Sequence, residues 1–108
     1  GLAALAALKD ARFPKYEDGK VDYKQKTDKK LDLKKEPMPV TVYKIGGHFV
    51  VDPLIDEEFS TDARLTVTSI DDNNLCAMQK GGDAALTHDD VKEMVALGLK
   101  KAKELRER

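Results

Sequence analysis

Carboxylates gather in one short stretch of this chain, and they are the side chains best suited to chemistry. Asp56, Glu57, Glu58 and Asp62 all fall between two stretches with strand-like patterns. Two carboxylates on one loop can hold Mg²⁺ through their oxygens or act as an acid and base pair. No Ser-His-Asp or Cys-His arrangement accompanies them, so covalent hydrolase chemistry is not expected. The spacing alone leaves two interpretations open, a candidate site and a solvated connecting loop.

The two histidines and the single cysteine do not indicate a metal site. His48 and His88 stand alone, without a second His or Cys at the spacing that zinc ligands need. Cys76 lies between Leu75 and Ala77, and we interpret it as a small buried apolar residue in a strand. A lone cysteine excludes an intramolecular disulfide and fits a reducing compartment such as the cytoplasm. We therefore expect no bound metal and no cofactor.

Lysines dominate residues 15–37, which hold eight of them against six acids. The stretch has no sustained period of 2 or 3.6 residues, so we predict a long solvated loop, with a short strand near 21–23 or 31–33. A run of lysines is commonly a solvated surface, but it can also face phosphate groups. The lysines that we regard as candidates for this are Lys29, Lys30, Lys34 and Lys35.

A glycine-rich segment, QKGGDAAL at residues 79–86, gives a further candidate. It lacks the P-loop pattern, so one interpretation is a strand-to-helix connection in which glycine adopts a positive φ. The other is that Lys80 and the following backbone amides face an anion near the helix start.

Composition limits the possible classes of protein. The 108 residues suffice for one domain, and 19 Lys and Arg against 20 Asp and Glu give a net charge of −1. This balance argues against a basic nucleic-acid-binding arm, although a local patch can be basic in a neutral chain. No apolar run approaches the ~20 residues of a membrane span, so no membrane partner is expected. Because the chain opens on LAALAAL without an initiator Met or a helix cap, we interpret it as a fragment of a longer protein.

The elements that would position these side chains follow from the hydrophobic pattern. The opening helix should end near residues 11–13, before Pro14. VTVYKI and HFVVD flank Gly46-Gly47, which predicts a β-hairpin, and RLTVTSI and NLCAMQK predict a second hairpin. Thr87 and Asp90 form a capping-box-like pair at the start of the last helix. Its apolar face consists of Val91, Met94, Val95, Gly98, Ala102 and Leu105.

These elements predict an α+β fold. Two β-hairpins form a mainly antiparallel four-stranded sheet, packed with an N-terminal and a C-terminal helix. We expect one domain over residues 1–108, with the long charged loop of residues 15–37 inside it.

Three segments of the chain resemble a known family. They are EPMPVTVYKIGGHFVVDP (residues 36–53), TDARLTVTS (61–69) and CAMQKGGDAALTHDDV (76–91), the last followed by the lysine-rich helix. Together they are similar to the second half of an RNase PH-like subunit of the archaeal exosome, and most of all to its non-catalytic ring subunit. The similarity is close over about two thirds of the chain.

The resemblance implies a place in a hexameric ring. Subunits of this kind alternate with catalytic RNase PH-like partners, beneath a cap of subunits that contain S1 and KH or zinc-ribbon domains. Such a ring threads RNA through its channel and degrades it from the 3′ end by phosphorolysis. The function implied is a non-catalytic structural and RNA-path subunit that supports the active site of its partner.

The resemblance also bears on the acidic cluster. Active family members carry two aspartates six positions apart on the loop between the hairpins, and Asp56 and Asp62 fit that spacing. We interpret them as non-catalytic, because the phosphate-binding part of the family's site lies in the other half of the subunit. They are then either vestigial or residues that help order the interface near the partner's active site. The alternative is a phosphate-dependent 3′-5′ exoribonuclease that uses these aspartates with a divalent metal. A third possibility is a small interaction domain unrelated to RNA.

Overall fold

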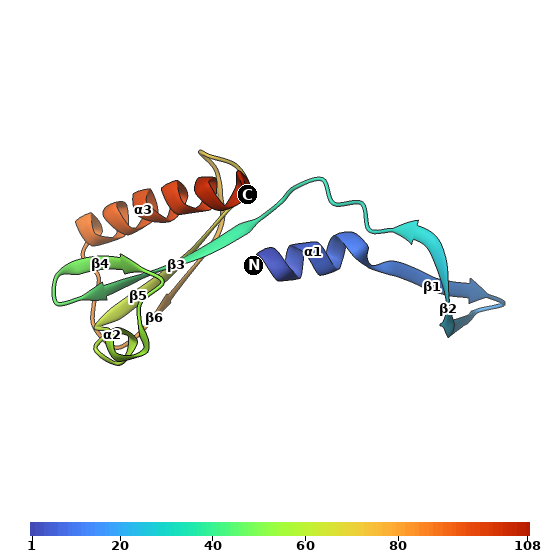
Figure 1. Ribbon diagram of the computed structural model, residues 1–108, viewed down its shortest axis with the longest axis horizontal. Helices are drawn as coiled ribbons and strands as arrows, with labels where there is room; N and C mark the ends of the chain where they lie inside the picture. Colours follow the sequence, from blue (N-terminus) through green and yellow to red (C-terminus); the bar gives the residue numbers. More distant parts are fainter. The chain divides into compact units, whose positions relative to one another are not determined.

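The computed structural model describes all 108 residues, and they divide into two compact units, residues 1–36 and 37–108. The first unit holds one helix and two strands, and the second holds four strands and two helices (Figure 1). In chain order the elements are α1 (Leu2–Asp10), β1 (Arg12–Glu17), β2 (Lys20–Lys30), β3 (Met38–Ile45), β4 (His48–Val51), α2 (Ile55–Phe59), β5 (Ala63–Ser69), β6 (Leu75–Gly81) and α3 (His88–Arg106).

The lysine-rich stretch is a β-hairpin, where the sequence predicts a long solvated loop. β1 and β2 pair antiparallel, and Asp18 and Gly19 form the two-residue turn between them. Both turn residues have positive φ, 52° and 73°, as the tight hairpin turn favoured by Asp-Gly requires. The predicted strand at 21–23 lies inside β2, whereas residues 31–33 are not in a strand. The sequence analysis missed this hairpin because it relied on alternating apolar residues, and the residues on both sides of Asp18-Gly19 are mostly polar.

Helix α1 ends close to its predicted position. It stops at Asp10, and Ala11 has extended backbone angles three residues before Pro14. As expected from the sequence, no side chain caps its start, and Lys9 in its last turn pairs with Glu36. None of its residues is buried, so α1 adds nothing to the buried core.

The four-stranded antiparallel sheet of the second unit is confirmed, with strand order β4-β3-β5-β6. Gly46 and Gly47 form the turn between β3 and β4 with φ values of 53° and 80°, and Ile45 pairs with His48 across it. Along β5, Ala63, Leu65 and Val67 are buried while the residues between them are more exposed. This alternation is the pattern of a sheet with one face on a core.

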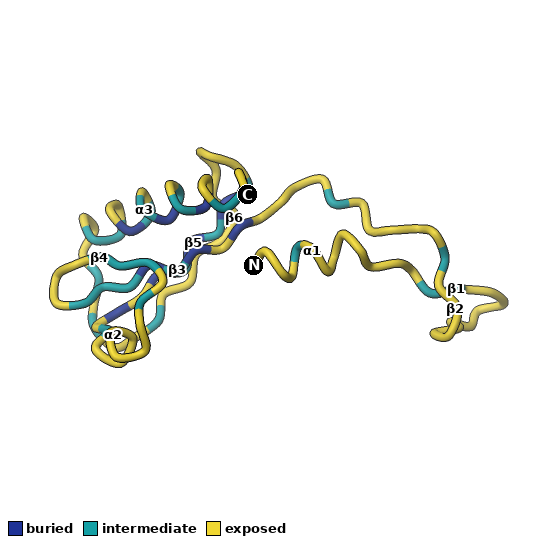
Figure 2. The backbone as a smooth tube through the Cα atoms, in the orientation of Figure 1, coloured by how far each residue is buried: buried dark blue, intermediate teal, exposed yellow.

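The core lies between the sheet and α3, as Figure 2 shows by the buried residues along β3, β5 and α3. Val42, Leu65, Val67 and Met94 form its centre. Gly98 allows the helix to approach closely, because a Cβ at this position would lie 3.2 Å from Val67 Cβ. The predicted apolar face of the last helix is confirmed, since Met94, Gly98 and Ala102 are its buried residues.

The start of α3 is fixed by the predicted pair. Asp90 N–H donates to Thr87 Oγ1 at 3.1 Å, and Thr87 N–H donates to the Asp90 carboxylate at 2.9 Å. The same carboxylate accepts from Lys44 Nζ at 2.7 Å, which ties the helix to β3. No helix in the chain is both long and apolar enough to span a membrane.

Two further local predictions are wrong. Cys76 is exposed, because β6 is an edge strand and α3 packs on β3 and β5. The acidic stretch contains the short helix α2 in place of a plain loop. Glu57 stabilises its first turn by accepting the Leu54 N–H at 2.8 Å.

Candidate functional site

Asp62 lies at the entry to β5 and is held by three hydrogen bonds. Its carboxylate accepts the Gly46 N–H at 3.0 Å, and its own N–H donates to the Lys44 carbonyl at 2.9 Å. Its carbonyl accepts the Ala84 N–H at 3.2 Å. Asp62 therefore braces the β3–β4 turn with its carboxylate and the segment before α3 with its backbone carbonyl.

Asp56 occupies a different setting, in the first turn of α2. It is exposed, and no side-chain hydrogen bond or ion pair holds it. Only its backbone carbonyl is engaged, by Ser60 Oγ at 3.2 Å. No interaction joins Asp56 to Asp62, so the proposed role of this pair stays a prediction.

A second pair of carboxylates, Asp52 and Glu58, shares a surface hollow that the sequence alone did not indicate. The hollow has a volume of about 340 Å³, and Thr41 and Tyr43 of β3 also line it. Asp52 directly follows β4 with a φ of 56°, a left-handed conformation that few residues other than glycine adopt. Asp52 and Glu58 are six positions apart, the same spacing as Asp56 and Asp62. The pair repeats the six-residue spacing but not the two aspartates that the family resemblance implies, so no sequence signal singled it out.

Cationic side chains line a second hollow that Asp52 also borders. A neighbouring hollow of about 410 Å³ is lined by Asp52 together with Lys101, Glu104 and Arg108 of the C-terminal end of the chain. Lys101 pairs with Glu104 at 2.9 Å, and the hydrogen bond from the Lys101 ammonium is the main reason that the pKa of Glu104 is lowered. Asp52 thus lines both hollows, one together with Glu58 and the other together with Lys101, Glu104 and Arg108.

The glycine-rich segment is a strand-to-helix connection, from β6 to α3, as one of its two interpretations from the sequence predicted. Gly82 has a φ of 87°, and a Cβ there would lie 2.9 Å from Ala63 Cα. Lys80 Nζ donates to the Gly82 carbonyl at 2.7 Å, so its ammonium group is engaged by its own loop. Gly81 leaves room for the Arg64 guanidinium, whose Cζ would lie 2.8 Å from a Cβ at position 81.

The remaining lysine candidates lie at or after the end of β2. Lys29 and Lys30 are the last residues of that strand, and Lys29 Nζ lies 5.6 Å from the centre of the Phe13 ring. Lys34 and Lys35 follow it, and all four are exposed. Lys34 lies 4.0 Å from Asp32, at the limit of an ion pair. Whether these lysines face RNA stays a prediction.

Two further carboxyl groups with shifted pKa values have structural partners. The Lys44 ammonium and the Thr87 N–H lower the pKa of Asp90. In the β5–β6 loop, hydrogen bonds from the Asn74 amide and the Asn73 N–H lower the pKa of Asp71. No three His, Cys, Asp or Glu side chains come close enough together to hold a metal ion.

Comparison with known proteins places these features in one family. Residues 35–101 match the 3′ exoribonuclease family, domain 2. The chain is 37% identical over 106 residues to the exosome complex component Rrp42 of Methanothermobacter thermautotrophicus, and 40% identical over 110 residues to that of Pyrococcus abyssi. These alignments cover 96% and 98% of this chain but 39% and 40% of those proteins. The chain therefore spans about two fifths of the length of the curated relatives it matches.

Solved structures give a consistent result. A chain of the Archaeoglobus fulgidus exosome with RNA bound to the active site matches with a TM-score of 0.60 and 35% identity. A chain of an archaeal exosome core matches with the same two values. Each match covers 66% of this chain, and 28% and 29% of the respective solved chains.

Proposed function

This chain belongs to the 3′ exoribonuclease family, of which it contains the second domain, and on this premise we propose that it serves as a structural and RNA-path subunit of an archaeal exosome. The observation that carries the proposal is the match along nearly the whole chain to proteins named exosome complex component Rrp42. Its partners would be a catalytic RNase PH-like subunit in a hexameric ring, an S1 and KH or zinc-ribbon cap subunit, and RNA. The location would be the cytoplasm.

The geometry of the acidic residues supports a non-catalytic role. Asp62 is engaged by the backbone of the β3–β4 turn, and Asp56 lies on a separate helix without a partner. A working carboxylate pair needs both groups directed at one reacting centre. Neither aspartate lines the hollow that Asp52 and Glu58 share.

One observation favours the alternative, a phosphate-dependent 3′-5′ exoribonuclease. Asp52 and Glu58 do line a common hollow, and two carboxylates on one hollow can hold a divalent metal. This alternative would move the catalytic pair from Asp56 and Asp62 to Asp52 and Glu58.

An RNA-degradation assay with inorganic phosphate and Mg²⁺ separates the two functions. The chain would be assayed alone, and the subunit that carries it would then be assayed with the catalytic RNase PH-like partner. The structural role predicts no nucleoside diphosphate release by the chain alone, and activity of the pair that survives Asp56→Ala and Asp62→Ala. Activity that persists in the pair with Asp52→Asn and Glu58→Gln would exclude the alternative pair as well.

The opposite result would reverse the assignment. If the subunit degrades RNA without its partner, and Asp52→Asn with Glu58→Gln abolishes this while Asp56→Ala does not, the protein is an enzyme in its own right. Failure of the subunit to assemble with the catalytic partner would overturn the proposed structural role.

A further inference from the structure

The β1–β2 hairpin presents two tyrosine side chains to solvent, outside any buried core. The side chains of Tyr16 and Tyr23 are 67% and 80% exposed. No residue of the hairpin is buried, so neither ring contributes to a core. Exposed tyrosines of this kind offer flat surfaces on which another ring can stack.

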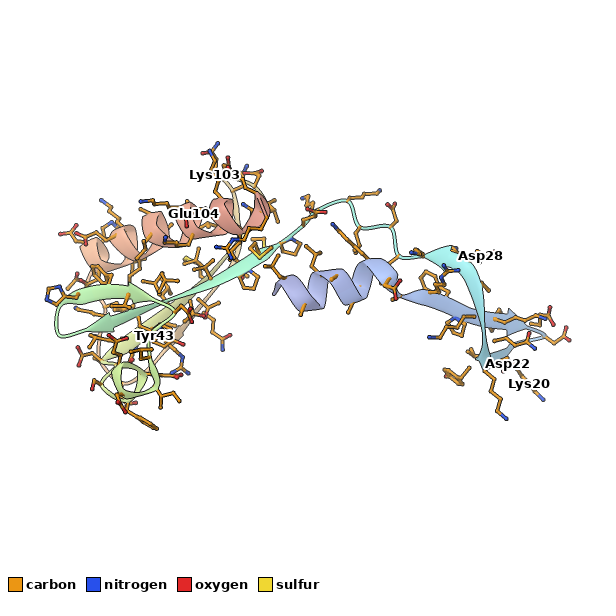
Figure 3. The ribbon with its side chains drawn as sticks, in the orientation of Figure 1. Lys20, Asp22, Asp28, Tyr43, Lys103 and Glu104 are labelled. Carbon is orange, nitrogen blue, oxygen red and sulfur yellow. The ribbon has the colours of Figure 1, made fainter.

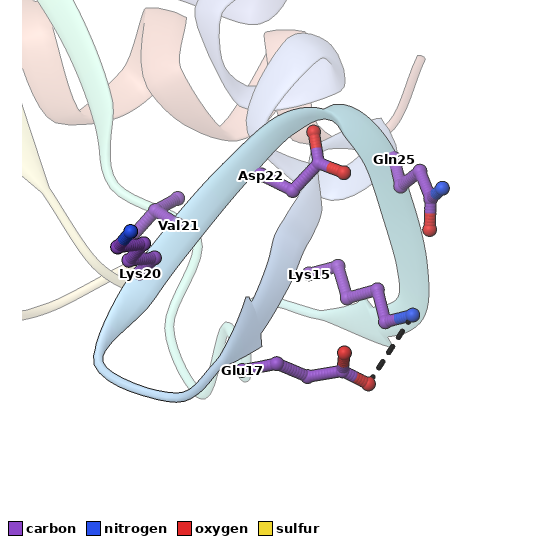
Figure 4. Close-up of a pocket in the computed structure, with 6 residues that line it drawn as sticks. All are labelled: Lys15, Glu17, Lys20, Val21, Asp22 and Gln25. Atoms are coloured by element: carbon purple, nitrogen blue, oxygen red, sulfur yellow. Dashed lines mark ion pairs between the residues drawn. The ribbon is translucent and has the colours of Figure 1, made fainter.

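A distortion of the hairpin accounts for the position of Tyr23. Lys15 pairs with Asp22 and the neighbouring Pro14 pairs with Lys26, so that β1 advances by one residue while β2 advances by four. Tyr23 therefore lies in a bulge outside the regular ladder, beside Lys24. Bulges redirect side chains and interrupt pairing, and Figure 4 shows β2 curving strongly through this part.

The cations of the hairpin are less neutralised than its carboxylates. Of its four carboxylates, Asp28 pairs with Arg12 at 2.9 Å and Glu17 pairs with Lys15 at 3.2 Å. Asp22 accepts only the backbone N–H of Lys24, at 3.0 Å, and Asp18 forms no ion pair. Five lysines of β2 form no ion pair, namely Lys20, Lys24, Lys26, Lys29 and Lys30. Figure 3 shows Lys20 projecting from the hairpin near its turn.

The charge of the whole chain is unevenly divided. Residues 1–36 hold ten Lys and Arg against seven Asp and Glu, a formal charge of +3. Residues 37–108 hold nine against thirteen, a formal charge of −4. The near-neutral total thus conceals a basic first unit, whose field favours a polyanion.

A hollow of about 350 Å³ lies on the hairpin itself, next to the bulge (Figure 4). Its lining includes the side chains of Lys15, Lys20 and Gln25, with Val21 as the apolar member. Its two carboxylates, Glu17 and Asp22, are the engaged ones described above. Lys20 is the lysine of this hollow without an ion pair, and together with the Gln25 amide it can contact a phosphate group and the edge of a base.

We propose that the β1–β2 hairpin is a binding surface for single-stranded RNA, in which bases stack on Tyr16 and Tyr23 while lysines of β2 contact the phosphates. This rests on the proposed function, to which it adds a site on the path of the RNA. Proteins that hold single strands without sequence preference combine a basic track with aromatic stacking, and this hairpin carries both components. An acidic protein surface is the competing occupant, but it would use the lysines without requiring the rings.

The test measures binding of a fluorescein-labelled oligoadenylate to the full 108-residue chain by fluorescence anisotropy. Tyr23→Ala and Tyr16→Ala should each weaken binding at least about fivefold, since stacking on one ring contributes that much or more. Tyr23→Phe keeps the ring and should bind as the wild type does. Phe59→Ala is the matched control, because Phe59 is an equally exposed aromatic residue, 86% exposed, but lies on the acidic helix α2.

Two further readouts separate stacking from charge. The association constant K falls as the salt concentration rises. Lys24→Gln removes one phosphate contact and should make the slope of log K against log salt concentration less negative by about 0.7. The chain has no Trp, so its ultraviolet emission comes from Tyr16, Tyr23 and Tyr43, and single-stranded RNA should quench the part that comes from Tyr16 and Tyr23. Duplex RNA, whose bases are already stacked, should quench it much less.

Equal RNA affinity of the wild type and the Tyr16→Ala, Tyr23→Ala double variant would overturn the proposal. So would a double variant that binds RNA normally but fails to assemble with the catalytic subunit, which would identify a protein-docking surface. The proposed function is tested separately, by measuring whether the wild-type subunit assembles into a ring with its catalytic partner and whether that assembly degrades RNA by phosphorolysis. Circular dichroism of each variant confirms that the fold is retained.

Discussion

Asp90 is the residue at which the last helix and the sheet are joined. Its carboxylate accepts both the Thr87 N–H and the Lys44 ammonium, at 2.9 Å and 2.7 Å. The sequence predicted the first contact from the local spacing of Thr87 and Asp90. It could not predict the second, because Lys44 lies 46 positions away along the chain.

Acid should weaken this junction. Lys44 and the Thr87 N–H lower the folded-state pKa of Asp90, so its contribution is present above the unfolded value of about 3.9 and is lost as pH falls through the lower folded value. Asp90→Asn should therefore reduce the melting temperature at neutral pH. The difference from the wild type should shrink below about pH 4, as thermal melts over a pH series would reveal. A constant difference across that range would contradict this role of the charge.

The hydroxyl of Thr87 gives an independent prediction. It accepts the Asp90 N–H at 3.1 Å and so caps α3. Thr87→Ala should lower the free energy of unfolding by about 1 kcal/mol, as loss of an N-cap does. Thr87→Ser keeps the acceptor and should cost much less. Urea denaturation measures both, and equal losses for the two variants would argue against the cap.

Among the elements, the strand-to-helix connection depends on glycine for two reasons. Gly82 has a φ of 87°, and a Cβ at this position would lie 2.9 Å from Ala63 Cα, which is too close for a van der Waals contact. Gly47 has a similar φ of 80° but open space around it. The two positions therefore separate the cost of the backbone conformation from the cost of the contact.

The matched substitutions Gly47→Ala and Gly82→Ala test this distinction. Gly47→Ala should lower the free energy of unfolding by about 1 kcal/mol, the cost of a left-handed residue with a Cβ. Gly82→Ala should cost about 2–4 kcal/mol, because the backbone of β5 must also shift. Urea denaturation measures both losses of unfolding free energy. Equal losses would mean that the backbone near Gly82 can move to accommodate a Cβ without a loss of stability.

At the scale of the whole molecule, every buried residue of the core belongs to the second unit. The buried apolar side chains run from Met38 to Ala102, and the first unit contributes none. A two-stranded hairpin without a buried face is marginally stable in water. The second unit therefore contains the buried core that its fold needs, whereas the first has no buried core of its own.

Removal of residues 1–36 should leave a folded domain. The truncated chain, residues 37–108, should unfold cooperatively with a melting temperature close to that of the full chain, because no core contact is lost. Calorimetry of both chains checks this. Loss of the cooperative transition in the truncated chain would show that the first unit is needed for the fold.

The sequence by itself determined the elements whose signals are local. The Gly46-Gly47 hairpin, the alternation along β5 and the capped helix from Thr87 follow from residues within a few positions of one another, and the structure confirms them. Tertiary structure alone decided which carboxylates meet. Two carboxylate pairs with the same spacing lie between β4 and β5, and only folding placed Asp62 under the β3–β4 turn and Asp52 with Glu58 on one hollow. Such choices depend on hydrogen bonds and burial between distant segments, which no local pattern encodes.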